Sequence, residues 1–137
     1  MDSPNKIVQA CEKHFDQFIG DCSGFVKAVA TELGLTLDGQ ANNIVDEILR
    51  PPWSELQGNK EANANAALGW FVVAGLKDMP HGHVVVIVPG STGDTYPTAY
   101  WGSLAGKSGK NKTINWAWKH VDLPNVVFGY YTTKLLG

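Results

Sequence analysis

Residues 19–34 read IGDCSGFVKAVATELG, and the interpretation of the whole chain starts from this stretch. Apolar residues recur at every fourth position from Phe25 to Leu33, which predicts a helix over residues 23–34 that ends at its final glycine. Cys22 stands at the first turn of this helix rather than in the middle of its apolar face. Because a structural cysteine normally lies in the middle of such a face, the position of Cys22 needs a chemical explanation.

Two further helices are predicted on either side of this stretch. The run that follows Pro4 repeats apolar residues on one helical face, and Cys11 belongs to that face. Cys11 is therefore expected to pack in the core as a small hydrophobic residue. Residues 40–49 form a third helical pattern, which ends before Pro51.

After residue 68 the pattern changes from helical to extended. Four short β-branched and aromatic runs are broken by Gly and Pro: LGWFVVAGL at 68–76, GHVVVIVPG at 82–90, YPTAYWGS at 96–103 and VVFGYYT at 126–132. We expect three to five strands, mostly antiparallel because the connections are too short for a crossover helix. Helices followed by a sheet predict an α+β fold with the helices packed on one face. With no internal repeat or linker, residues 1–137 are expected to form one domain.

Composition excludes several classes of protein. The chain has 137 residues, 44% hydrophobic and 18% charged, which is typical of a soluble globular domain rather than a disordered one. Its net charge of −2 gives no reason to expect binding to nucleic acid or to an anionic membrane. The longest apolar run, residues 84–88, is too short to span a bilayer. The first ten residues lack a basic stretch followed by an apolar one, so we expect no secretory signal.

The position of Cys22 suits covalent catalysis. The unpaired N–H groups and the positive dipole end of a helix start favour an anion, and the thiolate is the nucleophilic form of cysteine. Asp21 is expected to cap the helix, and Gly24 to let a substrate approach the backbone. N–H groups near Cys22 are also suited to an oxyanion. The alternative is that Cys22 only packs at the end of the core.

A cysteine nucleophile needs a base, and His83 is the strongest choice. On a strand that begins near residue 82, His83 is rooted in the sheet, whereas His81 lies in the preceding turn. A base must be held rigidly, which favours the strand position. His14 and His120 have charged or polar neighbours and are expected at the surface. The alternative for His83 is a satisfied histidine at a strand entrance.

Two other uses of these side chains are considered. Cys11 with His14, and His81 with His83, could supply four zinc ligands, but the spacings are atypical and Cys11 faces the core. We therefore expect no metal and no other cofactor. A disulfide between Cys11 and Cys22 is not needed by a domain of this size and seldom forms in a reducing cytosol, so both thiols are expected to be free.

Several aromatic side chains could line a substrate cleft, namely those of Trp53, Trp70, Tyr100 and Trp101. In a small domain, aromatic residues are more often part of the core. We therefore assign none of them to the site.

Three segments together resemble a known family: DCSGFVKAVATELG at 21–34, GHVVVIV at 82–88 and YPTAYWGSLAG at 96–106. They are similar to the NlpC-type branch of papain-like cysteine peptidases. Within that branch, the chain is most similar to the small peptidoglycan amidase effectors of bacterial type VI secretion systems. The resemblance implies a papain-like, NlpC-type single domain. It also implies an antibacterial toxin that hydrolyses amide bonds in the peptide stems or cross-bridges of Gram-negative peptidoglycan.

The resemblance implies roles for individual residues. Cys22 would be the nucleophile and His83 the general base, with the backbone N–H groups of Cys22 and Ser23 as the oxyanion hole. The family's third position, a polar residue that orients the imidazole, lies on the strand after the histidine. That strand reads PTAYWGS here and contains no Asp, Asn, Gln or His. Thr98, Ser103, a backbone carbonyl or a water remain as alternatives.

The resemblance also implies partners and a destination. Such effectors are made in the cytoplasm, loaded into the type VI machinery without a signal peptide and delivered to the periplasm of target cells. A cognate periplasmic immunity protein is expected. The bond cleaved could be the γ-glutamyl to diaminopimelate link or the D-alanine to diaminopimelate cross-bridge. The alternatives are a housekeeping cell-wall cysteine peptidase and a non-catalytic binding module.

Overall fold

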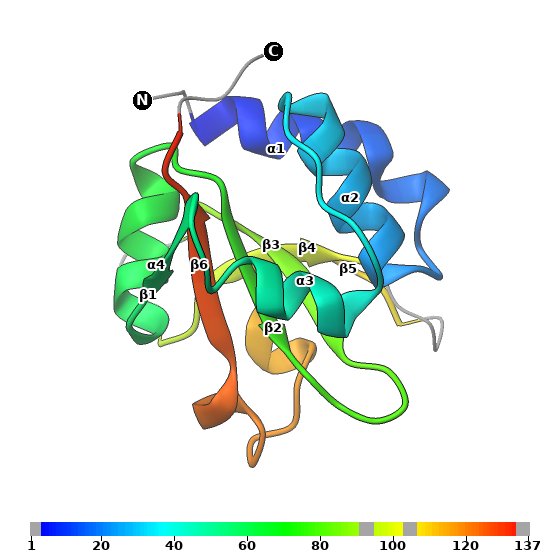
Figure 1. The fold of residues 1–137 in the computed structure, drawn as a ribbon, viewed down its shortest axis with the longest axis vertical. Coiled ribbons are helices and arrows are strands. Elements are labelled where there is room, and N and C mark those ends of the chain that lie inside the picture. The colour runs from blue at the N-terminus through cyan, green and yellow to red at the C-terminus, as the bar shows by residue number, and fades with distance from the viewer. Residues whose placement is uncertain (1–3, 91–94, 103–106, 134–137) are drawn as a thin grey trace.

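The computed structural model describes residues 4–90, 95–102 and 107–133, and these form an α+β fold (Figure 1). The helices are α1 (Pro4–His14), α2 (Cys22–Glu32), α3 (Ala41–Glu47) and α4 (Gly58–Ala67), with 3-10 turns η1 (Phe15–Gln17), η2 (Ile114–Trp116) and η3 (Leu123–Asn125). The strands are β1 (Trp53–Leu56), β2 (Val72–Leu76), β3 (His83–Val88), β4 (Thr98–Trp101), β5 (Gly109–Thr113) and β6 (Val127–Tyr131). The predicted fold, with N-terminal helices packed on an antiparallel sheet, is confirmed. None of the helices in the described ranges is long and apolar enough to cross a membrane.

The sheet has the strand order β1-β6-β2-β3-β4-β5, and all of its pairs are antiparallel. The central pair joins β2 to β3 in a register that sets Leu76 opposite His83. On the other side, β3 pairs with β4, with Val88 opposite Thr98. Thr98 therefore lies beside the last residue of β3, whereas His83 is its first residue.

The two faces of the sheet carry separate apolar cores, as the alternation along β3 shows. Val84 and Val86 pack with α1, α2 and α3, whereas Val85 and Ile87 point to the opposite face and pack with α4. The prediction that the helices cover one face is therefore wrong for α4, which covers the other (Figure 1). The helix is NANA-rich and buries mainly alanine, so its apolar face is weakly marked in the sequence.

Helix α2 is held on the sheet by fully buried side chains. Phe25, Val26 and Val29 belong to the same core as Val84 and Val86 of β3. Burial of each such side chain contributes about 1.5–3 kcal/mol. This packing fixes the first residue of α2 relative to the beginning of β3, which is where the sequence predicts a catalytic site.

Candidate active site

Cys22 is the first residue of α2, and Asp21 caps the helix as predicted. The Asp21 carboxylate accepts a hydrogen bond from the backbone N–H of Gly24 at 2.9 Å, and its backbone carbonyl accepts one from Phe25 at 3.0 Å. The N–H groups of Cys22 and Ser23 interact instead with the Cys22 sulfur. These two backbone donors lower the pKa of the thiol.

Gly24 lies in close contact with the Asp21 side chain that caps α2. A Cβ at this position would lie 2.3 Å from Oδ2 of Asp21 and 2.9 Å from the ring of Phe18. The missing side chain therefore makes room for the capping carboxylate.

Burial dominates the ionisation of the Cys22 thiol, whose side chain is 3% exposed. This burial raises the pKa of Cys22, and the nearby charge of Asp21 raises it further. A hydrogen bond from the backbone N–H of Val84 lowers the pKa, as do the N–H groups of Ser23 and Cys22 itself. The net shift is upward, so the lowered pKa expected from the helix start is wrong for this buried thiol.

His83 is the first residue of β3, while His81 is exposed in the loop before it, as predicted. The imidazole is largely buried, and burial lowers the pKa of His83 to about 4. Its ring packs edge-on against two indoles, with centroid distances of 5.3 Å to Trp118 and 6.4 Å to Trp101. In the described part of the chain, the ring makes no hydrogen bond.

The structure brings Cys22 and His83 to the same end of β3. The backbone N–H that acts on the Cys22 sulfur belongs to Val84, the residue next to His83. The thiol lies in the core on the α2 side of the sheet, whereas the two indoles that contact the imidazole belong to the core on the α4 side. Both residues therefore lie near the beginning of β3, Cys22 beside the backbone N–H of Val84 and His83 as the first residue of the strand.

Helix α3 holds the loop that leads into His83. The Asn42 side chain donates to the backbone carbonyl of Asp78 at 2.8 Å and accepts from the Asp78 N–H at 3.2 Å. A Cβ at Gly82 would lie 2.3 Å from the Asn42 side-chain oxygen, so a glycine is needed where the loop passes α3. These contacts fix the entry of the chain into β3.

Ser23 connects the starts of two helices. Its hydroxyl is buried and lies 3.2 Å from the Asp21 carboxylate and 3.1 Å from the side-chain oxygen of Gln40, which caps α3. The hydroxyl can donate its hydrogen to one of these acceptors at a time. Ser23 thus holds the start of α2 against the start of α3.

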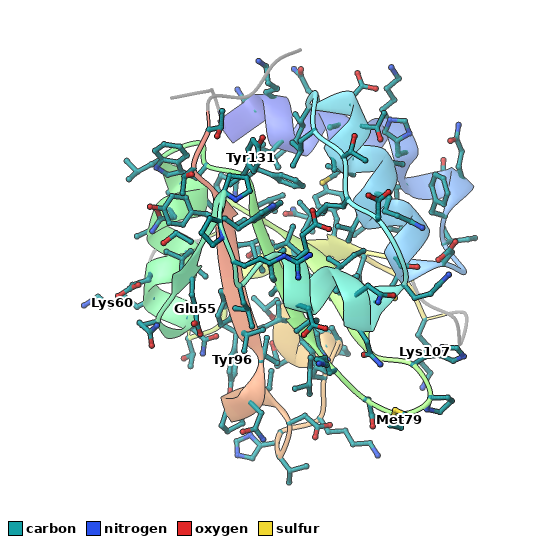
Figure 2. All side chains as sticks on the ribbon, viewed as in Figure 1. Glu55, Lys60, Met79, Tyr96, Lys107 and Tyr131 are labelled. Carbon is teal, nitrogen blue, oxygen red and sulfur yellow. The ribbon has the colours of Figure 1, made fainter. Side chains whose placement is uncertain are left out.

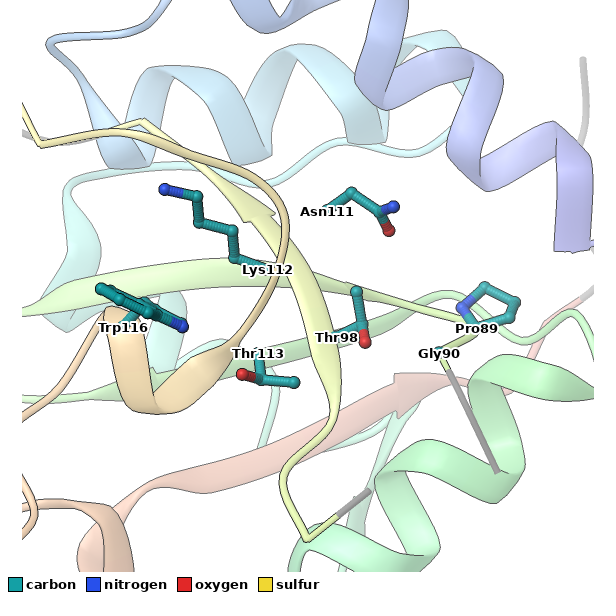
Figure 3. Close-up of a pocket in the computed structure, with 7 residues that line it drawn as sticks. All are labelled: Pro89, Gly90, Thr98, Asn111, Lys112, Thr113 and Trp116. Atoms are coloured by element: carbon teal, nitrogen blue, oxygen red, sulfur yellow. The ribbon is translucent and has the colours of Figure 1, made fainter. Parts of the chain in front are cut away.

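Among side chains, the sequence predicts Thr98 or Ser103 at the third position, beside the imidazole. Thr98 is opposite Val88, far along the strand from His83, and lines a pocket with Asn111 and Lys112 (Figure 3). Ser103 is outside the described residues. The residue of β4 that does contact the imidazole is Trp101, which sequence analysis left out of the site.

Sequence analysis also missed Trp118. It follows η2 and is 9% exposed, whereas the neighbouring Trp116 is 72% exposed. Nothing in the sequence NWAWKH distinguishes the buried tryptophan from the exposed one, and nothing in it connects Trp118 with His83.

Both cysteines are free, and the residues considered for zinc do not converge. Cys11 is fully buried in the core, as expected, and burial raises its pKa. Within the described ranges, no three His, Cys, Asp or Glu side chains lie close enough to hold a metal ion. The four zinc ligands considered from the sequence, Cys11, His14, His81 and His83, are therefore not assembled into a site.

Comparison with known proteins supplies independent information. No protein-family model matches the chain. The chain is 36% identical, over 145 aligned residues, to the peptidoglycan amidase Tse1 of Pseudomonas aeruginosa. The alignment covers 96% of this chain and 94% of that protein.

Proposed function

This chain belongs to the family of the peptidoglycan amidase Tse1, the type VI amidase effectors that its sequence resembles, and we propose that it is itself an antibacterial amidase. It hydrolyses amide bonds in the peptide stems or cross-bridges of Gram-negative peptidoglycan, and residues 1–137 act as a single catalytic domain. One observation carries the catalytic part of the proposal. A cysteine at a helix start packs against the backbone N–H of the residue that follows a strand-entry histidine.

In this mechanism Cys22 is the nucleophile and His83 the general base. The neutral imidazole takes the thiol proton as the sulfur attacks the carbonyl carbon of the scissile amide. The tetrahedral intermediate collapses to a thioester when protonated His83 gives that proton to the leaving amine. Water, deprotonated by the same imidazole, then hydrolyses the thioester and regenerates the thiol.

The backbone N–H groups of Cys22 and Ser23 form the oxyanion hole in this proposal. Support comes from the cap: Asp21 accepts the N–H groups of Gly24 and Phe25, while those of Cys22 and Ser23 are directed toward the reacting sulfur. An oxyanion that forms beside the sulfur would meet both donors at the positive end of α2.

Type VI delivery to the target periplasm and a cognate immunity protein complete the proposal. The immunity protein inserts a loop or helix between α2 and β3. Apolar side chains are exposed beside both segments: Ile19, 49% exposed, precedes α2, and Met79, 85% exposed, projects from the loop before β3 (Figure 2). Such a pair needs a nanomolar Kd or tighter, about −12 kcal/mol. The bound partner should protect Cys22 from iodoacetamide.

The proposed function is tested by digestion of purified Gram-negative sacculi and identification of the fragments by mass. We expect new amine and carboxyl ends at one stem or cross-bridge amide, with the glycan strands intact, and none in a digest without the protein. The masses also distinguish the γ-glutamyl link from the D-alanine cross-bridge. Binding to sacculi without new fragments would instead identify a non-catalytic binding module.

A further inference from the structure

The surroundings of His83 are unusual for a general base. A catalytic imidazole is normally oriented by a hydrogen bond to its second ring nitrogen. Here the ring instead packs edge-on against two indoles, at interplanar angles of 68° to Trp118 and 86° to Trp101. In the part of the chain that the structure describes, no side chain forms a hydrogen bond with the ring.

We propose that Trp118 and Trp101 position the His83 imidazole for proton transfer. The inference rests on the proposed function, because it requires His83 to be the general base. It assigns both tryptophans a positioning role rather than a catalytic one, since they act through the imidazole.

Both indoles are themselves fixed. Trp101 is 2% exposed, and its ring lies against the backbone of Gly109 on β5, where a Cβ would be 2.2 Å from the indole. The backbone N–H of Trp118 donates to the carbonyl of Ile114 at 3.1 Å, which ties it to η2. Indole rings held in one position restrict the rotation of an imidazole packed against them.

The two indoles disfavour the charged form of the His83 imidazole. An indole has a single N–H donor and no acceptor, so neither tryptophan can accept a hydrogen bond from the second N–H of an imidazolium. Burial is the cause of the lowered pKa of His83. Burial raises the pKa of Cys22 and lowers that of His83, so both groups are neutral at rest, and in the proposed mechanism charge develops only when the substrate is attacked.

The experiment compares four tryptophan variants of the full chain. Trp118→Ala and Trp118→Leu remove the ring edge, whereas Trp118→Phe keeps one. Trp116→Ala is a matched control at an exposed tryptophan, which lines the pocket in Figure 3. The measurements are kcat and KM on soluble muropeptides, the melting temperature, and the NMR titration of His83, assigned by its absence in His83→Gln.

We expect Trp118→Ala and Trp118→Leu to lower kcat about 10- to 100-fold, as loss of a supporting partner typically does, with little change in KM. In both variants the pKa of His83 should rise toward 6.5 because solvent reaches the ring. Trp118→Phe should recover most of kcat and the low pKa, and Trp116→Ala should match the wild type.

The inference is overturned if folded Trp118→Leu keeps the kcat and the His83 titration of the wild type, or if Trp118→Phe loses as much as Trp118→Leu. Trp118→Leu keeps an apolar side chain at this position but leaves space beside the imidazole, so this comparison does not depend on whether Trp118→Ala folds. The His83→Ala variant separates the two proposals. Full activity in His83→Ala would remove the base assignment itself, whereas an inactive His83→Ala beside unaffected Trp118 variants would remove only the positioning role.

Discussion

Opposing effects act on the pKa of the Cys22 thiol. Burial and the charge of Asp21 raise its pKa, while the N–H groups of Val84, Ser23 and Cys22 lower it. Because the upward shift prevails, the resting thiol is protonated at neutral pH. A protonated thiol is a poor nucleophile, so in the proposed mechanism catalysis depends on removal of the proton by His83 during the attack.

The contribution of Asp21 can be isolated by Asp21→Asn. The amide oxygen still accepts the N–H of Gly24, so the helix keeps its cap, but the charge that raises the pKa of Cys22 is lost. We expect faster alkylation of Cys22 by iodoacetamide at pH 8, by up to about tenfold per pKa unit. Asp38→Asn at an exposed position is the control. An unchanged rate in Asp21→Asn would show that this charge does not reach the thiol.

Burial of His83 makes the stability of the protein depend on pH. The unfolded chain protonates this imidazole near pH 6.5, whereas the folded protein resists protonation down to about pH 4. The unfolded state therefore binds more protons in this window, and stability falls as the pH drops through it. Between pH 6.5 and pH 4, the free energy of unfolding of the wild type should fall by up to about 3 kcal/mol more than that of His83→Gln. Parallel denaturation curves for the two proteins would contradict the buried neutral state.

At the scale of elements, the site depends on contact between the end of β4 and the segment before α2. Gly102 follows β4, and a Cβ there would lie 2.0 Å from the carbonyl oxygen of Phe18 and 2.7 Å from that of Asp21. Both obstacles are backbone atoms, which cannot rotate away as a side chain can. Any side chain at residue 102 would therefore displace the chain just before Cys22.

Gly102→Ala tests this dependence. We expect a stability loss of about 1–3 kcal/mol from overpacking and a large loss of kcat, because the cap and the thiol move together. Gly58→Ala is the control: its Cβ would meet nothing within 4 Å, but its φ of +87° makes alanine strained. That variant should lose about 1 kcal/mol and keep full activity. A fully active Gly102→Ala would show that the start of α2 tolerates the shift.

The elements that the sequence predicts well are those with strong apolar periodicity. Helix α2 and strand β3 are found within a residue or two of their expected bounds, and they carry the proposed dyad. Strands β1 and β5 and helix α4 were not predicted. Strand β5 reads GKNKT and is polar because it is an edge strand, β1 has four residues, and α4 buries mainly alanine.

At the scale of the whole molecule, contacts between distant segments complete the site. The position of Cys22 relative to β3 follows from the amphipathic pattern of α2, so its placement near the beginning of β3 could be predicted. The contact of Trp118 with His83 depends on how the segment after η2 packs against the sheet. No local sequence pattern predicts that packing. Gly82 and Gly102 likewise match backbone positions that only the folded structure reveals.

The central claim is that the thiol of Cys22, and not that of Cys11, performs the hydrolysis with His83. The most direct test measures the amidase rate of Cys22→Ala and Cys11→Ala on the same muropeptide, with folding checked by thermal denaturation. Cys22→Ala should keep the fold and lose at least about a thousandfold in rate, as should His83→Ala and the double variant, because the pair acts as a unit. Cys11→Ala should keep most of the rate and lose only stability, through a small cavity in the core. An active Cys22→Ala beside a folded but inactive Cys11→Ala would contradict the account.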